Sequence, residues 1–247
     1  MAGKWERQNP PRLVGYESWL YQMPCMDNCG DVFISVPLPK DADLRGEPPN
    51  RWLVAVGDVS GRGEAASRLK EQMEAEINRL VGTTVDPAPI LMALNNDPFD
   101  PDRFACLMVA VIDSDSHELT LASAGQVAPL IRRVDRRVES VAQEAIGYPL
   151  WILPEPTYEN VTVPIGPGEV VIFQSDGVTA VIDHHDHLFD LNSLRLAIAQ
   201  AIGDAASVGR SILEAIRRFG QGRPQMDDIT LLCVGRPVPQ DSHKPKG

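Results

Sequence analysis

The stretch Trp52-Leu-Val-Ala-Val-Gly-Asp-Val-Ser-Gly-Arg-Gly63 joins an apolar run to a helical pattern. Its first five residues predict a buried strand, which runs directly into Gly57 and Asp58. From Glu64 to Val81, apolar residues recur at spacings of three and four, which predicts an amphipathic helix. The glycines lack both the Gly-Lys-Ser/Thr ending of a phosphate-binding loop and the spacing of a dinucleotide-binding loop. The stretch therefore predicts a strand, an acidic turn and a helix.

Apolar and patterned runs elsewhere in the chain predict the remaining elements. Further strands are expected at Val32–Val36, Phe104–Ile112, Leu119–Ala122, Leu130–Val134, Val170–Phe173 and Ile229–Val234. Further helices are expected at Pro89–Asn95, Leu191–Ile202 and Val208–Phe219. The turn Asp113–His117 favours a hairpin, and we expect Leu130–Val134 to continue the meander that follows it. Because strands and helices do not alternate strictly, the order favours an α+β layered fold with antiparallel sheets.

Composition limits the class of protein. The chain has 247 residues, 43% of them hydrophobic, which suits one globular domain or two small ones. Its net charge of −11, without a basic stretch, argues against binding to nucleic acid. The apolar runs are too short to span a bilayer, and the N-terminus has no apolar stretch typical of a secretory signal. Four cysteines in a chain of this length predict no disulfide framework, so we expect a cytoplasmic protein.

The chain shows no internal linker or repeat. Residues 1–12 are polar and contain proline, which predicts a flexible arm. Residues 237–247 hold too few apolar side chains to fold and are expected to be a disordered tail. Between them, residues 13–236 are expected to form one domain. Within it, residues 37–50 are rich in Pro, Asp and Gly and predict a surface loop.

Acidic residues gather at the ends of the predicted strands. The four are Asp31, Asp58, Asp176 and Asp227. One such aspartate is usually a turn or cap residue, but four that converge would repel one another unless cations neutralise them. Oxygen ligands of this kind suit Mg²⁺ or Mn²⁺. Two such ions would balance four carboxylates, activate a bridging water and neutralise a phosphoryl group.

Three of these segments occur in a characteristic order: Gly57–Gly63, Ser175–Thr179 and Asp227–Leu232. Together they resemble the metal-dependent PPM (type 2C) protein serine/threonine phosphatases, in their bacterial SpoIIE-like branch. Weaker matches are Cys29–Asp31, Arg103–Asp113, Ala122–Leu130 and Ile146–Leu150. The resemblance covers roughly residues 14–236, nearly the whole chain.

The resemblance implies a four-layer α-β-β-α sandwich of two mainly antiparallel sheets flanked by helices. It also implies two divalent cations, Mn²⁺ or Mg²⁺, at one edge of the sheets. Asp58 would bridge both ions, the carbonyl of Val59 and the side chain of Asp31 would serve the second, and Asp176 and Asp227 would hold the first. Asp58, Asp176 and Asp227 would thus be the catalytic residues. A metal-bridging hydroxide would attack phosphoserine or phosphothreonine on a protein substrate, without a covalent enzyme intermediate.

Many members of this branch act on an anti-sigma-factor antagonist, so such a phosphoprotein is the substrate that the resemblance implies. Because the chain holds little beyond a catalytic domain, control is expected from a regulatory partner, a homodimer or a separate site. The sequence departs from the family pattern at Cys29, Ile34, Gln126 and Ala180, and Asp228 is expected to support the site rather than bind metal.

Two alternatives remain open. The first is a pseudophosphatase, weak or inactive, that binds a phosphoprotein or an anti-sigma partner. The second is a metal-dependent hydrolase of small phosphate esters. Two local clusters also allow two interpretations: Asp183–His187 as a solvated turn or a metal site, and Arg132–Arg137 as a solvated hairpin turn or a binding patch for an acidic partner. Cys106 and Cys233 are expected to be buried in strands.

Overall fold

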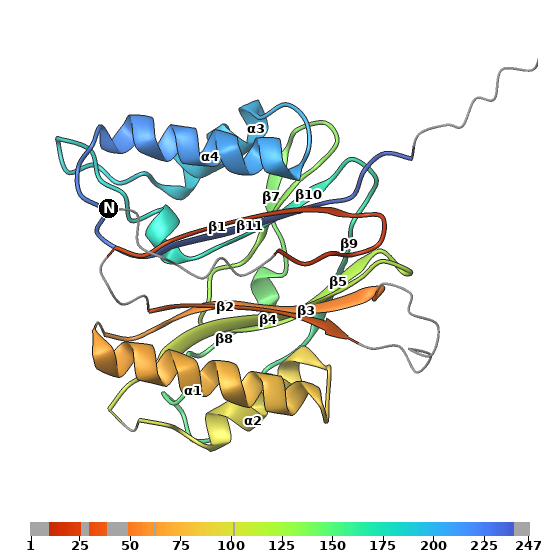
Figure 1. Cartoon of the computed structure of the whole chain (residues 1–247), viewed down its shortest axis with the longest axis vertical. Coiled ribbons are helices and arrows are strands. Elements are labelled where there is room, and N and C mark those ends of the chain that lie inside the picture. The colour runs from red at the N-terminus through yellow and green to blue at the C-terminus, as the bar shows by residue number, and fades with distance from the viewer. Residues whose placement is uncertain (1–9, 26–29, 39–48, 62, 101, 240–247) are drawn as a thin grey trace, which may run out of the picture.

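The computed structural model describes residues 10–25, 30–38, 49–61, 63–100 and 102–239. These residues form four layers, with two β-sheets stacked between two pairs of helices (Figure 1). Helices α1 (Glu64–Val81) and α2 (Pro87–Asn96) cover one sheet, and α3 (Leu191–Gln200) and α4 (Ala205–Gly220) cover the other. The expected α+β sandwich with four layers is confirmed.

The two sheets are almost entirely antiparallel. One has the order β1-β11-β10-β6-β7, formed by β1 (Glu17–Met23), β6 (Leu130–Arg132), β7 (Val138–Ser140), β10 (Val170–Gln174) and β11 (Ile229–Gly235). The other has the order β2-β3-β4-β5-β8, formed by β2 (Asp31–Leu38), β3 (Arg51–Val59), β4 (Ala105–Asp113), β5 (Glu118–Ala124) and β8 (Ile146–Gly147). Strand β9 (Val161–Pro164) also pairs with β5, and only the short β5–β8 pair among the described strands is parallel.

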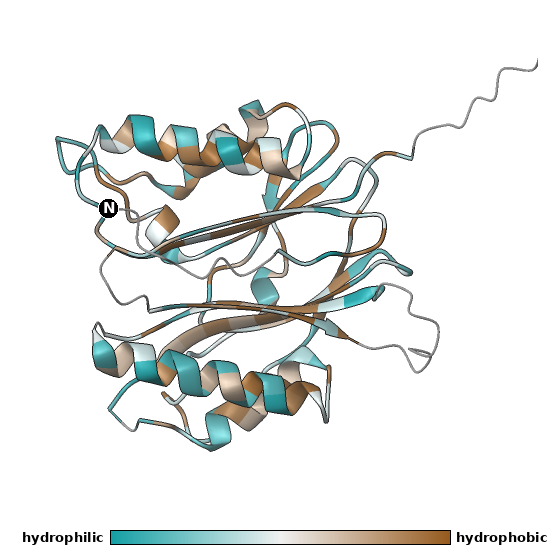
Figure 2. Cartoon of the chain, in the orientation of Figure 1, coloured by the Kyte–Doolittle hydropathy of each residue, from teal (hydrophilic) through white to brown (hydrophobic). Residues whose placement is uncertain are grey.

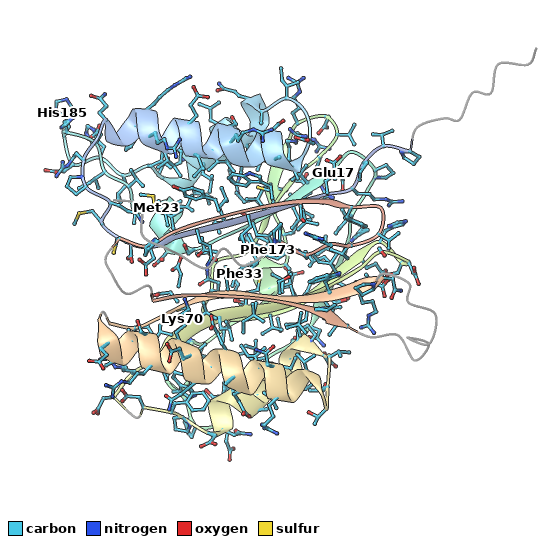
Figure 3. The ribbon with its side chains drawn as sticks, in the orientation of Figure 1. Glu17, Met23, Phe33, Lys70, Phe173 and His185 are labelled. Atoms are coloured by element: carbon cyan, nitrogen blue, oxygen red, sulfur yellow. The ribbon has the colours of Figure 1, made fainter. Side chains whose placement is uncertain are left out.

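Successive side chains of each strand point to opposite faces of its sheet, and apolar side chains on these faces form three layers. The central layer lies between the sheets and includes Phe33 of β2 and Phe173 of β10, which face each other in Figure 3. Val32 and Ile34 point the other way, into the layer beneath α1 and α2. The helices turn their apolar sides inward and leave polar residues outside (Figure 2). This period of two fixes which face of the sheet each strand-end aspartate occupies.

Most predicted elements occur within a few residues of their expected bounds, and α1 matches them fully. The expected continuation of the β4–β5 meander is wrong. Strand β6 lies in the opposite sheet, where it pairs with β10 and β7. The chain leaves β5 at Gly125, whose φ of +74° turns it away, and Pro129 then separates it from β6.

Parts of the predicted organisation lie outside the described residues. These are residues 1–9 of the expected arm, 240–247 of the expected tail and 39–48 of the expected loop. The division into arm, domain and tail therefore stays a prediction. In the described part of the chain, the helices are too short or too polar to cross a bilayer.

Candidate functional site

Asp31 and Asp58 lie side by side on neighbouring strands. Asp31 begins β2 and stands opposite Asp58 near the end of β3, and Asp58 in turn stands opposite Cys106 of β4. Opposed residues of antiparallel strands share a face of the sheet, here the face toward the other sheet. Asp31 is 1% exposed, whereas Asp58 is partly buried. The sequence predicted Cys106 as a buried strand residue, but it is only partly buried, and its place beside Asp58 follows from the strand register.

The second sheet carries Asp176 and Asp227 to the same edge. Asp176 begins the 3-10 turn η3 (Asp176–Val178), directly after β10, and Asp227 precedes β11. The pairing of these strands is extended by Ser175, whose Oγ accepts a hydrogen bond from the amide of Thr230 at 2.9 Å. A Cβ on Gly177 would lie 1.8 Å from the carbonyl oxygen of Asp228. Only glycine therefore allows the turn after β10 to pack against the start of β11.

Asp228 connects the two sheets at this edge. Its carboxylate accepts hydrogen bonds from the amides of Gly30 at 2.5 Å and Cys25 at 2.7 Å. A Cβ on Gly30 would lie 2.9 Å from Oδ1 of Asp58 and 3.6 Å from the carbonyl oxygen of Val59. Asp58 and Val59 thus present two oxygen atoms around Gly30. Both carboxylate oxygens of Asp228 accept hydrogen bonds from the backbone, so Asp228 holds the chain before β2 in place.

Burial and mutual repulsion shift the carboxyl pKa values upward. Burial raises the pKa of Asp31 to about 7, against hydrogen bonds from Thr230 and Ser175 that lower it. Burial, followed by the charges of Asp31, Asp176 and Asp227, raises the pKa of Asp58 to about 7.

The same causes act on neighbouring groups. Asp176 is exposed at the rim, yet partial desolvation and the charge of Asp227 raise its pKa. Desolvation, followed by the charges of Asp58 and Asp176, raises the pKa of Cys106 to about 11. Among the described residues, no Lys or Arg forms an ion pair with Asp58, Asp176 or Asp227. The edge therefore concentrates negative charge that described basic side chains do not neutralise.

The donor set suits hard divalent cations. It consists of carboxylates and a backbone carbonyl, the oxygen ligands that Mg²⁺ and Mn²⁺ prefer. The carboxylates interact electrostatically across the two sheets. Nevertheless, no three His, Cys, Asp or Glu side chains of the described residues are grouped as a ready-made metal site. The structure thus brings the predicted residues to one edge without closing them into a complete coordination shell.

Two departures from the family pattern have structural roles. Gln126 is buried, and its Nε2 donates to the carbonyl oxygen of Gln174 at 3.0 Å, which ties the loop after β5 to β10. Ile34 lies on the opposite face of β2 from Asp31 and is buried beneath α1. Of the other two departures, Cys29 lies outside the described residues, and Ala180 follows η3, where its amide donates to the carbonyl oxygen of Asp176 at 3.0 Å.

Asp183–His187 forms an exposed turn (His185 is labelled in Figure 3). Desolvation raises the pKa of Asp183, but hydrogen bonds from the amides of His187 and His185 outweigh it and lower that pKa to about 2. The carboxylate of Asp183 closes the turn by accepting these bonds. The solvated-turn interpretation is therefore confirmed.

The basic cluster Arg132–Arg137 lies at the β6–β7 hairpin. Arg133 pairs with Glu139 and Glu169, and Arg137 pairs with Asp135. These pairings support the hairpin-turn interpretation over the binding patch.

Comparison with known proteins identifies the family. The profile of the family described as Stage II sporulation protein E (SpoIIE) matches residues 48–237. The chain belongs to the SpoIIE family. Phosphoserine phosphatase RsbU of Bacillus subtilis (strain 168) is 24% identical over 188 residues, which make up 75% of this chain and 56% of RsbU. The SpoIIE-family chain thus spans little more than half the length of this curated relative.

Solved structures share its fold. The SiaA-PP2C domain of Pseudomonas aeruginosa superposes with a TM-score of 0.72 at 18% identity, over 88% of this chain and 84% of the domain. The catalytic domain of the serine/threonine protein phosphatase PstP, solved in complex with two manganese ions, superposes with a TM-score of 0.59 at 15% identity, over 89% of this chain and 97% of that domain. The four layers of the SpoIIE-family chain are therefore those of the PP2C fold.

Proposed function

We propose that this SpoIIE-family chain is a metal-dependent protein serine/threonine phosphatase. The observation that carries the proposal is the acidic edge, where Asp31 and Asp58 from one sheet meet Asp176 and Asp227 from the other. The SpoIIE family profile and the RsbU relative, which is named a phosphoserine phosphatase, support it.

The proposed ligands are those that the family resemblance implies. Asp58 would bridge two divalent cations, Asp176 and Asp227 would hold the first, and Asp31 and the carbonyl of Val59 would serve the second. The two manganese ions of the PstP neighbour support the binding of divalent cations in this fold. When bound, Mn²⁺ or Mg²⁺ ions supply an activated water and neutralise charge on the phosphoryl group.

The chain's own residues would place and expose the reacting phosphate. Asp228 and Gly30 hold the start of β2 against β11, which sets the separation of the two carboxylate pairs. Asp176 is exposed at the rim, so a phosphorylated side chain can approach from solvent. We propose phosphoserine or phosphothreonine on an anti-sigma-factor antagonist as the substrate, in the cytoplasm, with control by a regulatory partner or a homodimer.

Hydrolysis of a chromogenic phosphomonoester tests the proposal. Activity should require Mn²⁺ or Mg²⁺, stop with EDTA, and fall by more than about 100-fold in Asp58→Asn, because the variant removes the bridging charge. Asp97→Asn is the matched control, since Asp97 is exposed at the end of α2. Turnover that is independent of metal, or unchanged in Asp58→Asn, excludes this mechanism.

One observation favours the pseudophosphatase alternative, namely that the described side chains form no ready-made metal cluster. A calorimetric titration of the full chain with Mn²⁺ separates the two. Binding that is lost in Asp58→Asn but accompanied by no hydrolysis of phosphoserine peptides would favour a binding module. A panel of small phosphate metabolites beside the peptides separates the small-ester hydrolase.

A further inference from the structure

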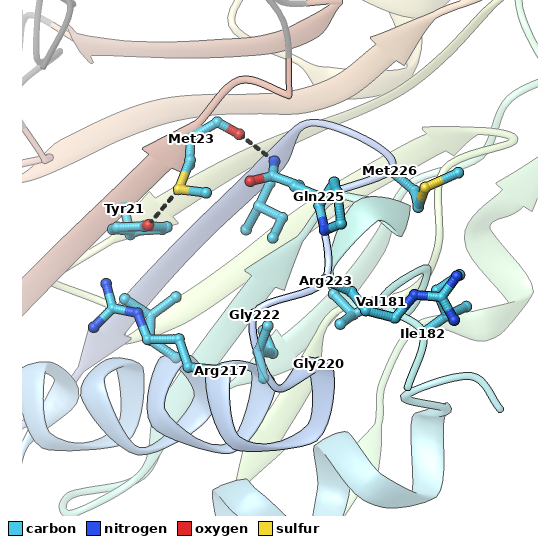
Figure 4. A pocket seen from close by; sticks show the side chains of 14 residues that line it. Tyr21, Met23, Val181, Ile182, Arg217, Gly220, Gly222, Arg223, Gln225 and Met226 are labelled. Carbon is cyan, nitrogen blue, oxygen red and sulfur yellow. Dashed lines mark hydrogen bonds between the residues drawn. The ribbon is translucent and has the colours of Figure 1, made fainter. Parts of the chain in front are cut away.

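A cavity of about 280 Å³ opens beside the acidic edge (Figure 4). Its walls come from β1, from α4, from the segment that follows η3 and from the loop that leads into β11. The innermost lining is aliphatic, with Leu213, Ile216 and Ile229 each less than a tenth exposed. This volume suits one side chain of a partner rather than a large organic ligand.

The cavity shares a wall with the acidic edge. Gln225 lines the cavity, and its Nε2 donates to the carbonyl oxygens of Met23 and Asp227. The next lining residue, Met226, directly precedes Asp227. A peptide bound at Asp227 would therefore pass over the mouth of the cavity within a few residues.

Two flexible methionine side chains lie at the mouth of the cavity. Met23 is 41% exposed and Met226 is 50% exposed, and both line the cavity. A single exposed apolar residue needs no explanation, but here two methionines, on either side of Gln225 in Figure 4, line the same aliphatic cavity. Unbranched, polarisable side chains of this kind fit partners of varied shape.

The charged residues of the lining are arginines, although the whole chain carries a net charge of −11. Arg217 and Arg223 lie on opposite sides of the cavity in Figure 4. Arg223 donates to Asp186 and to the carbonyl oxygen of Asp183. Arg217 is exposed in the last turn of α4, and no described acidic residue forms an ion pair with it. The opening therefore offers a positive charge to a carboxylate of an incoming chain.

We propose that this cavity docks the phosphoprotein substrate, receiving an apolar side chain near the phosphoserine while an acidic neighbour of that side chain pairs with Arg217. The inference rests on the proposed phosphatase function and adds a sequence preference to it. The apolar floor selects the side chain, and the arginine selects the charge beside it. An exposed ion pair contributes modestly, so the apolar contact should provide most of the selectivity.

Four phosphoserine peptides of one length test the preference. They carry Leu or Ala at the docking position and Glu or Lys beside it, and the pair is moved through the six positions on each side of the phosphoserine. At one register, the full chain with Mn²⁺ should hydrolyse the Leu-Glu peptide with a kcat/KM about tenfold above that of the Ala-Lys peptide, mainly through KM. Equal kcat/KM for all four peptides at every register overturns the proposal.

Two variants locate the effect in the cavity. Val181→Phe fills the space beneath the mouth and should abolish the preference for Leu over Ala. Arg217→Glu should reverse the preference between Glu and Lys. Arg210→Glu is the matched control, because Arg210 is exposed on the same helix but does not line the cavity. Circular dichroism verifies folding, and hydrolysis of the chromogenic ester should stay within about twofold in all three variants because that ester is too small to reach the cavity.

Failure of docking and failure of the phosphatase function are distinguishable. If wild type hydrolyses the chromogenic ester but ignores the peptide series, docking is wrong and the enzyme assignment stands. If it hydrolyses nothing, fluorescence anisotropy of the same labelled peptides, with the full chain, tests docking alone. A binding preference for the Leu-Glu peptide that Val181→Phe removes supports docking, and the absence of such a preference overturns the docking proposal.

Self-association of the chain is the other outcome that overturns the proposal. Self-association that rises with concentration and that Val181→Phe abolishes, without peptide selectivity, would assign the cavity to a second copy of the chain.

Discussion

The carboxylate of Asp228 accepts a hydrogen bond from the amide of Gly30 at 2.5 Å, across 198 positions of sequence. The bond joins the start of β11 in one sheet to the start of β2 in the other. A hydrogen bond to a charged acceptor is stronger than one between neutral groups. Asp228 therefore holds the start of β2, which carries Asp31, against the start of β11, which Asp227 precedes.

Asp228→Asn should weaken both folding and metal binding. The variant removes the charge that holds the amides of Gly30 and Cys25, which should lower the free energy of unfolding by about 1–3 kcal/mol. Mn²⁺ affinity should fall by about 10–100-fold, the usual effect of losing a supporting residue behind a metal ligand. Urea unfolding and calorimetric titration measure the two effects, with Asp97→Asn as the control. Unchanged Mn²⁺ affinity would show that the bond does not position the site.

Gly30→Ala should displace Asp58 without strain on the backbone. The added methyl group would lie 2.9 Å from Oδ1 of Asp58, so the carboxylate must move. We expect the metal-dependent rate to fall by about tenfold or more. Gly82→Ala, at the end of α1, is the matched control. A Cβ at Gly82 would lie 3.3 Å from the carbonyl oxygen of Arg79, and Gly82 does not belong to the acidic edge. Equal rates for both variants would contradict the proposed role of Asp58.

Stability of the metal-free protein should fall as the pH rises. The folded-state pKa values of Asp31 and Asp58 are about 7, well above the ordinary 3.8, so the folded chain binds more protons than the unfolded chain between these values. The free energy of unfolding therefore decreases with rising pH through this window, and the contribution of the raised pKa values is complete only below about pH 4.

Divalent cations should reverse this loss, because they stabilise the ionised carboxylates. The increase in Tm on adding Mg²⁺ should be larger near pH 8 than near pH 5, measured against the same protein in EDTA. Asp58→Asn should flatten both the pH dependence and the Mg²⁺ effect. A Mg²⁺ effect of equal size at both pH values would indicate binding elsewhere.

Gln126→Ala should destabilise the fold but leave the affinity for metal almost unchanged. The variant leaves the buried carbonyl of Gln174 without its donor, which should cost about 1–3 kcal/mol in urea unfolding. Mn²⁺ affinity should stay within about threefold, because Gln126 supports the loop after β5 and binds no proposed ligand residue. A large loss of Mn²⁺ affinity with little loss of stability would instead place Gln126 in the site.

The fold was predictable where the pattern is local. Helix α1 matches its expected bounds because five buried residues recur at helical spacing between Gly63 and Gly82. Strand β1 was missed because it is short and lies at a sheet edge. Its Trp19 and Tyr21 pack toward α4 and its Leu20 faces the central layer, so it shows no simple alternation of apolar and polar residues. Strand β6 was placed in the wrong sheet because partner choice depends on the long-range register with β10, which composition does not encode.

The site was predictable as a set of residues but not as a geometry. Aspartates at the ends of apolar runs, three of them next to a glycine, indicated the acidic edge, and the strand register then placed Asp31 opposite Asp58. Nothing local indicated that Gln126 would bond to Gln174, or that Gln225 would join Met23 to Asp227. These contacts connect segments that are distant in sequence, so only the packed structure identifies them.

Neither sheet can assemble the acidic edge alone, since each contributes two of the four aspartates and the strand β1 that precedes β2 belongs to the opposite sheet. The proposed phosphatase activity therefore requires that the two sheets pack correctly against each other. No single cut of the chain separates the two sheets, because β1 precedes β2 and β6 and β7 precede β8, so any pair of fragments would divide at least one sheet.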